Sequence, residues 1–206
     1  MTQMRFLVWL LMLVLSGCGP IAEVVVDGTF PQPLVRSAPL AVGVYYSEQF
    51  RNFKHEQMEY DKVMYSISTG ASQVELFDTL FRALFASATR IEALPPVADT
   101  TGLDAVLVPQ VEELQFSVPE DTRSHSFEIW IKYSMRLLTP QGEPIHEWTM
   151  AAYGKTPVAF MKSQEEALHQ ATIVALRDAG AHLATDFARD PALIAWLESN
   201  RAEVKK

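Results

Sequence analysis

The chain has only one cysteine, Cys18. One thiol cannot form an internal disulfide, and it cannot supply the paired cysteine ligands of a structural zinc site. Five histidines are present, but none has the His-x-x-x-His or His-Glu-x-x-His spacing of a metal-binding motif. The sequence therefore predicts no metal site and no cofactor, and we expect packing alone to stabilise the fold.

Basic residues are also scarce. Lys and Arg number 17 against 25 Asp and Glu, which gives a net charge of −8 at pH 7. Nucleic-acid binding requires clustered cations that displace the counterions of the phosphates. This balance argues against a nucleic-acid partner, and it also disfavours flat docking on anionic lipid headgroups.

Sequence motifs of common active sites are missing as well. The chain has no Gly-x-Ser-x-Gly elbow, no Gly-x-x-x-x-Gly-Lys phosphate loop and no Gly-x-Gly-x-x-Gly turn. The adjacent Glu112 and Glu113 could act as an acid/base pair only if a bulge turned both to one face, because neighbouring strand residues point to opposite sides. We therefore expect a protein that is not an enzyme and has no catalytic residues.

The N-terminus has the layout of a secretory signal peptide. Arg5 precedes an apolar run over residues 6–15, and this run is shorter than the roughly 20 residues that a spanning helix needs. The run ends in Leu15-Ser16-Gly17-Cys18, in which an aliphatic residue and two small residues precede the cysteine. This tetrapeptide resembles the lipobox of bacterial lipoproteins.

The lipobox resemblance implies cleavage between Gly17 and Cys18, a diacylglycerol thioether on Cys18, and acylation of the freed amine by a fatty acid such as palmitate. Two or more acyl chains make a lasting membrane anchor, whereas one is marginal. Gly19 stands where an aspartate would retain a lipoprotein in the inner membrane. The resemblance therefore implies an outer-membrane protein whose domain faces the periplasm. The alternatives are an uncleaved anchor and an ordinary thiol.

These observations divide the chain into four parts. We expect a cleaved signal peptide over residues 1–17, a lipidated N-terminus and proline-rich linker over 18–39, a single periplasmic domain over 40–200, and a frayed tail over 201–206. Within the linker, Val24-Val25-Val26 is compatible with a short edge strand or with a plain spacer.

The periodicity of apolar residues predicts an α+β domain. Alternation predicts strands over 40–46, 62–68, 103–118, 127–138 and 145–153, and helical spacing predicts helices from Ser72 towards Pro95, over 163–188 and over 190–196. We expect strands 40–46 and 62–68 to pair antiparallel, a bulge near Glu112, and capping boxes at Ser72 and Ser163. This order favours a mixed, mainly antiparallel sheet with two long helices packed on one face. It is loosely similar to periplasmic lipoprotein domains that activate penicillin-binding proteins or build the curli secretion channel, without shared motifs.

Two regions are candidates for partner binding. Residues 47–61 mix charged and aromatic side chains, which is compatible with a recognition loop presenting Phe50, Arg51 and Phe53 or with a hairpin loop whose aromatics point inward. Trp130 and Trp148 are expected on the solvated face of the hairpin, as an apolar patch that a partner or a helix must cover.

The leading hypothesis is a non-catalytic binding or assembly module for an envelope complex, with the membrane as a second partner through the lipid on Cys18. One alternative is a carrier for lipid or lipopolysaccharide, with Trp130 and Trp148 lining an apolar groove. A cell-wall hydrolase assembled from distant residues is the second alternative.

Overall fold

The computed structural model describes residues 22–204, apart from residues 61, 159–162 and 188. The expected signal peptide and the expected lipidation and cleavage residues, Cys18 and Gly17, lie outside the described residues. Between these limits the chain forms two sheets and four helices, so the predicted α+β class is confirmed.

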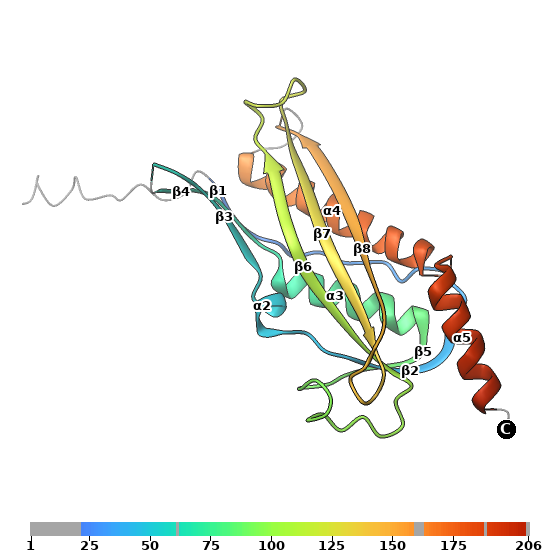
Figure 1. The fold of residues 1–206 in the computed structure, drawn as a ribbon. Helices are drawn as coiled ribbons and strands as arrows, with labels where there is room; N and C mark the ends of the chain where they lie inside the picture. The colour runs from blue at the N-terminus through green and yellow to red at the C-terminus, as the bar shows by residue number, and fades with distance from the viewer. Residues whose placement is uncertain (1–21, 61, 159–162, 188, 205–206) are drawn as a thin grey trace, which may run out of the picture.

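The larger sheet has five strands in the order β5-β2-β6-β7-β8. Its strands are β2 (Ala38–Val44), β5 (Phe85–Arg90), β6 (Ala105–Ser117), β7 (Ser126–Leu138) and β8 (Pro144–Pro157). Strands β6, β7 and β8 form an antiparallel meander, while β2 pairs parallel with both β5 and β6. The long strands of the meander cross in front of the helices in Figure 1.

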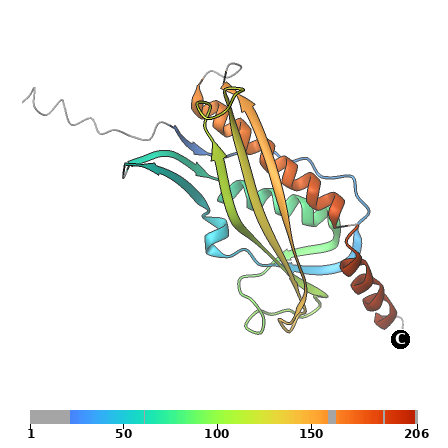
Figure 2. The same cartoon turned by 45° about the horizontal axis from the view of Figure 1, so that its top comes forward.

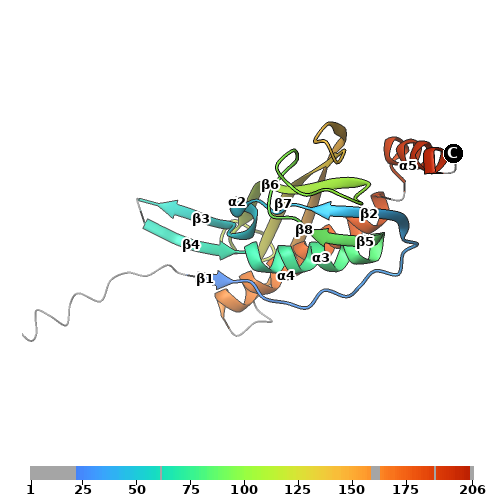
Figure 3. The ribbon, with the colours of Figure 1, turned by 90° about the horizontal axis from the view of Figure 1, so that it is seen from below.

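The smaller sheet has the order β1-β4-β3 and extends away from the body of the molecule (Figures 1 and 3). Its strands are β1 (Ala22–Val25), β3 (Lys54–Glu59) and β4 (Lys62–Ser68). β4 pairs antiparallel with β3 and parallel with β1. The expected pairing of 62–68 with 40–46 is therefore wrong. The charged segment before residue 62 itself forms a strand, and closing a short hairpin costs less entropy than closing a long loop.

The four helices are α2 (Glu48–Arg51), α3 (Gly70–Leu84), α4 (Gln164–Asp186) and α5 (Pro191–Val204). Figure 2 shows α4 running along β8. The cap of α4 is as predicted, because the Ser163 side chain accepts a hydrogen bond from the Glu166 N–H. The cap predicted at Ser72 is wrong: α3 begins at Gly70, and the Ser72 hydroxyl donates instead to the carbonyl oxygen of Val26.

Helix α3 is shorter than its sequence pattern predicts. It ends at Leu84, and the chain continues directly as β5 beside β2. Phe85 begins this strand and is buried against Phe81 and Phe187. The contact with Phe187, more than 100 residues away, shows that tertiary packing overrides the local helical spacing here.

The core lies on one face of the larger sheet. Phe77 of α3 packs on Tyr133 of β7, with ring centroids 5.3 Å apart. The α4 backbone packs against Gly154 of β8, whose cross-strand neighbour is Ile129. The predicted inward residues of β7 are all buried: Phe127, Ile129, Ile131, Tyr133, Met135 and Leu137.

The N-terminal segment is packed rather than free. β1 is an edge strand, as one of the two interpretations of Val24-Val25-Val26 predicted. Phe30 is buried, and the chain around it lies over Leu76 of α3 and Gly180 of α4. Within the expected linker, β1 and Phe30 thus pack on the rest of the fold.

Candidate interaction surface

The second face of the larger sheet exposes an aromatic pair. Trp130 of β7 and Tyr153 of β8 are cross-strand partners whose ring centroids are 5.2 Å apart. Trp130 is 39% exposed and Tyr153 is 38% exposed, although both belong to long strands in the middle of the chain. Aromatic side chains that remain this exposed on a sheet face are suited to contact another surface.

Ion pairs frame this aromatic pair. The Lys155 ammonium lies 2.7 Å from a Glu128 carboxylate oxygen, and Lys132 lies 2.5 Å from Glu112. Burial and the nearby Glu128 carboxylate raise the pKa of Tyr153. We call this surface the Trp130 patch; it consists of Glu112, Glu128, Trp130, Lys132, Tyr153 and Lys155.

The bulge predicted near Glu112 is present, since the β6–β7 register shifts between Val111 and Glu113. Glu112 pairs with Lys132, whereas Glu113 accepts a hydrogen bond from the Gln115 amide at 2.5 Å. Glu112 and Glu113 thus have separate partners, and only Glu112 belongs to the patch.

Trp148 lies on the opposite face of the sheet from Trp130. Its cross-strand partner is Met135, and it stacks on His146 at 5.6 Å while packing against the core. The expectation that both tryptophans share the solvated face is therefore wrong. The cause is a one-residue register shift between Leu137 and Leu138, because a slip of one residue turns every later side chain to the other face.

The segment 47–61 contains α2 and β3 in place of a loop. Phe50 is 2% exposed and packs between Tyr46 and Phe77, so it belongs to the core and is not accessible to a partner. Arg51 is exposed on α2, and Phe53 is half-buried. Phe50 and Phe53 thus point inward, as the hairpin interpretation of this segment predicted, whereas Tyr60 is 90% exposed and departs from it.

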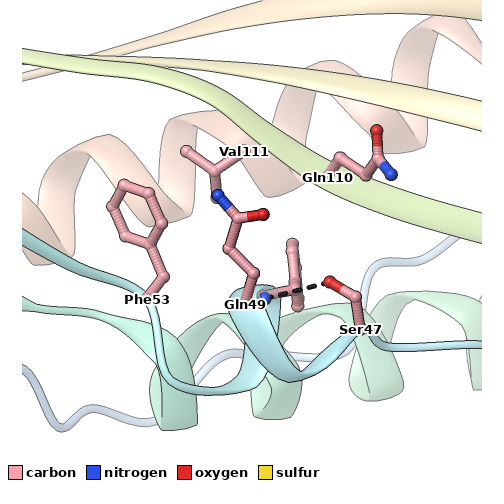
Figure 4. A pocket seen from close by; sticks show the side chains of 6 residues that line it. Ser47, Gln49, Phe53, Gln110 and Val111 are labelled. Carbon is pink, nitrogen blue, oxygen red and sulfur yellow. Dashed lines mark hydrogen bonds between the residues drawn. The ribbon is translucent and has the colours of Figure 1, made fainter.

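Phe53 lines a small cavity between α2 and β6 (Figure 4). Gln49 and Val111 approach each other across it, and Ser47 caps α2 by accepting from the Phe50 N–H at 3.1 Å. The cavity measures about 100 Å³, well below the roughly 300–1,000 Å³ of most ligand pockets. The side-chain amides of Gln49 and Gln110 line this cavity and can hydrogen-bond a few water molecules.

A larger surface cavity of about 610 Å³ lies where the β5–β6 connection meets the β7–β8 turn. Leu94, Pro95 and Leu138 give it apolar walls, and the cross-strand neighbours Arg136 and Glu147 contribute one charge of each sign. The Arg136 Nε is buried without a hydrogen-bond partner among the described residues. The volume and this free donor suit a small ligand that has an acceptor group for Arg136 and an apolar part.

Other site chemistry is limited. In the part of the chain that the structure describes, no three His, Cys, Asp or Glu side chains gather closely enough to hold a metal ion. None of the described helices is long and apolar enough to span a bilayer. Burial lowers the pKa of His55, whose ring packs edge-on against Phe116.

No protein-family model matches this chain, and no curated protein matches it. Among solved structures, a Xanthomonas campestris protein of the DUF330 family has a TM-score of 0.48 at 12% identity, covering 92% of this chain and 99% of that one. A candidate lipoprotein from Caulobacter crescentus has a TM-score of 0.44 at 14% identity, covering 77% and 91%. Lipoprotein GNA1162 from Neisseria meningitidis has a TM-score of 0.22 at 20% identity, covering 27% and 36%. These low scores and identities support no argument about family or function.

Sequence reasoning identified Trp130 but missed Tyr153, its neighbour in the patch. Leu138 faces Pro144 next to the β7–β8 turn. If that register continued unchanged along the two strands, Trp130 would face Ala152. The one-residue shift beyond Leu138 is what brings Tyr153 opposite Trp130. A local signal for the outward face of Tyr153 does exist, because polar Glu147, Thr149 and Lys155 share its parity along β8.

Proposed function

We propose that this protein is a lipid-anchored periplasmic lipoprotein that binds a protein partner of the cell envelope through the Trp130 patch, without catalysis. The observation that carries the proposal is the aromatic pair on a sheet face, with Trp130 and Tyr153 each more than a third exposed. Aromatic side chains are enriched at the centres of protein interfaces, where they supply much of the binding energy.

The charges of the patch support a protein partner over an anionic surface. Glu128 pairs with Lys155 and Glu112 pairs with Lys132, so cations and anions balance around the aromatics. Such a rim favours a partner with a mixed polar surface, and it provides no basic field for phosphates.

The anchor rests on the tetrapeptide that ends at Cys18 and on Gly19 after it. Attachment to the outer membrane would hold the domain in the periplasm. Mass spectrometry of the mature protein should find an acylated N-terminal Cys18, and Cys18→Ser should release the protein from the outer-membrane fraction. An intact N-terminus would contradict the anchor.

Partner binding is tested by crosslinking in intact cells followed by pull-down. Trp130→Ala and Tyr153→Ala should each reduce recovery of the crosslinked partner at least several-fold. Val97→Ala is the matched control, because Val97 is 83% exposed but lies in the β5–β6 connection away from the patch. Undiminished recovery with both patch variants would exclude the patch. Turnover of peptidoglycan by the purified domain would contradict the non-catalytic assignment.

The cavity at Arg136 favours a second candidate function, the carrying of an acidic amphiphile such as a lipid. Native mass spectrometry of the purified protein should then find a co-purified acidic ligand. Arg136→Met, which keeps an unbranched apolar stem but removes the guanidinium and its charge, should abolish that ligand. Absence of any bound ligand in the parent protein would rule the carrier function out.

A further inference from the structure

The hairpin formed by β3 and β4 ends in exposed apolar side chains. At its tip Tyr60 is 90% exposed, and Met58 close by is 59% exposed. The hairpin extends beyond the body of the molecule, and Tyr60 lies in its turn (Figures 1 and 3).

Neither the turn nor the packing accounts for a tyrosine at position 60. Its φ is +47°, a conformation that is unfavourable for bulky residues and is normally taken by Gly or Asn in tight hairpins. Its exposure means that core packing does not compensate for this strain. Strained residues of this kind concentrate where the side chain has a functional contact.

The strand register relates this tip to the proposed anchor. β1 runs parallel to β4, with Ala22 opposite Tyr65. β1 therefore begins at the end of the smaller sheet that carries the β3–β4 turn. Three strand steps from Tyr65 back to Lys62, at about 3.3 Å each, span roughly 10 Å, and Tyr60 lies in the turn beyond Lys62. The four residues from Ala22 back to Cys18 reach at most about 14 Å.

We propose that the hairpin tip inserts Tyr60 and Met58 into the interface of the same bilayer that holds the acyl chains of Cys18. This inference rests on the lipidation in the proposed function. The bilayer surface must lie within reach of Cys18, and the β3–β4 hairpin projects from the body of the molecule at the end where β1 begins (Figure 3). The tip is thus the part of the described chain that meets the bilayer first.

The chemistry of the tip suits an interface rather than anionic headgroups, because Glu59 and Asp61 flank Tyr60 in the sequence and would repel anionic lipid. Tyrosine is enriched at membrane–water interfaces because its ring is apolar and its hydroxyl is polar. Met58 adds a flexible apolar side chain. The net charge of −8 disfavours electrostatic attraction to anionic lipid, so we expect contact with zwitterionic lipid.

The consequence is a fixed orientation. Acyl chains at one residue hold a protein to the membrane but leave it free to tilt, whereas a second contact restricts the tilt. With the tip in the interface, the β5–β6 connection and the cavity at Arg136 point away from the anchor end of the molecule (Figure 1).

The test uses the full-length acylated protein in vesicles of zwitterionic phosphatidylcholine. Acylation blocks Cys18, so a nitroxide label attaches at a cysteine introduced by Met58→Cys, with Val97→Cys as the exposed control. Collision rates with oxygen and with a water-soluble nickel complex then report depth. We expect the label at 58 to collide preferentially with oxygen and the label at 97 with nickel. Adding Tyr60→Asn, which suits the turn, should move the label at 58 towards water.

The outcomes separate the two proposals. Vesicle flotation with an aqueous label at 58 would overturn the membrane contact and leave the anchor intact; the tip would then be free for a protein partner. A label at 58 that Tyr60→Asn does not move would overturn the role of Tyr60. Failure of the acylated preparation to float with vesicles would overturn both the anchor and the contact.

Discussion

Gly154 of β8 lies directly against the backbone of Ala171 in α4, so that a Cβ at residue 154 would overlap the Ala171 carbonyl oxygen. The close approach brings the alanine-rich surface of α4 onto the sheet, with Ala171, Ala175 and Ala179 fully buried. This contact sets the distance between the helix and the strand that carries Tyr153.

We predict that Gly154→Ala destabilises the fold by about 1–3 kcal/mol or more, because the obstructing atoms belong to the helix backbone and cannot rotate away. The midpoint of urea unfolding measures the change. Thr149→Ala is the control on the same strand, since Thr149 is exposed and such surface changes stay within about 0.5 kcal/mol. Equal midpoints for both variants would contradict the packing argument.

A buried polar network joins α3 to the sheet. The Gln73 amide donates to the Phe50 carbonyl at 2.6 Å, and its oxygen accepts from the hydroxyls of Thr69 and Tyr133 at 3.3 Å each. Burial raises the pKa of Tyr133, so its hydroxyl stays a donor at all ordinary pH values. Losing Gln73 would leave several buried polar groups unpaired at once.

We therefore predict that Gln73→Leu costs more stability than Tyr133→Phe. The first should cost at least about 1–3 kcal/mol for unsatisfied buried groups, and the second about 0.5–1.5 kcal/mol for one lost hydrogen bond. Urea unfolding of both single variants and of the double variant measures the coupling between them. Because Phe keeps the ring and removes only the hydroxyl, a larger loss for Tyr133→Phe would contradict the central role of Gln73 in this network.

Asp190 ties α5 to the sheet in a pH-dependent manner. Burial acts to raise the pKa of Asp190, but hydrogen bonds from the Leu193 N–H, from His146 and from the Ala192 N–H outweigh it and lower the pKa. A carboxylate with a lowered folded-state pKa adds stability above its unfolded pKa of about 4, and loses it as the pH falls through the folded value.

We predict that α5 loosens as the pH drops below about 4, the ordinary pKa of Asp. Hydrogen exchange of the α5 amides across pH 2–6, corrected for intrinsic rates, measures this. Asp190→Asn should remove most of the pH dependence and lower protection at neutral pH. An unchanged acid response in that variant would assign the effect to another group.

The ion pairs of the Trp130 patch should matter for binding more than for stability. Lys132 and Glu112 have side chains that are 49% and 35% exposed, and exposed pairs contribute about 0–1 kcal/mol. Lys132→Ala and Glu112→Ala should leave the unfolding midpoint nearly unchanged but weaken crosslinked capture of the partner, most strongly at low salt. A large stability loss with normal capture would contradict the assignment.

The element types were largely predictable because they depend on local pattern. Alternation identified β7 and most of β8, helical spacing identified α3 and α4, and Ser163 marked the start of α4. The errors lie at β5 and at the pairing of β4, where the partner is distant in sequence. Phe85 continues a helical pattern, yet its contacts with β2 and Phe187 hold it extended.

The candidate site was harder to predict than the elements. Phe50 and Phe53 looked equally available, but a short helix turns Phe50 into the core beside Phe77. Trp130 and Trp148 looked like neighbours, but the shift after Leu137 separates them onto two faces. The residue types marked these aromatic side chains as candidates for partner binding. Only helix α2 and the strand register show what each of them contacts.

The sequence by itself determined the α+β class, the apolar face of β7, the α4 cap and the composition that leaves no paired cysteines or basic clusters. These properties follow from residue types and spacings within a dozen residues. Tertiary structure alone decided that Tyr153 joins Trp130, that β1 lies parallel to β4, and that the hairpin tip projects beside the start of β1. Strand register and pairing depend on packing between distant segments, and a one-residue shift costs little locally while reversing which side chains reach solvent.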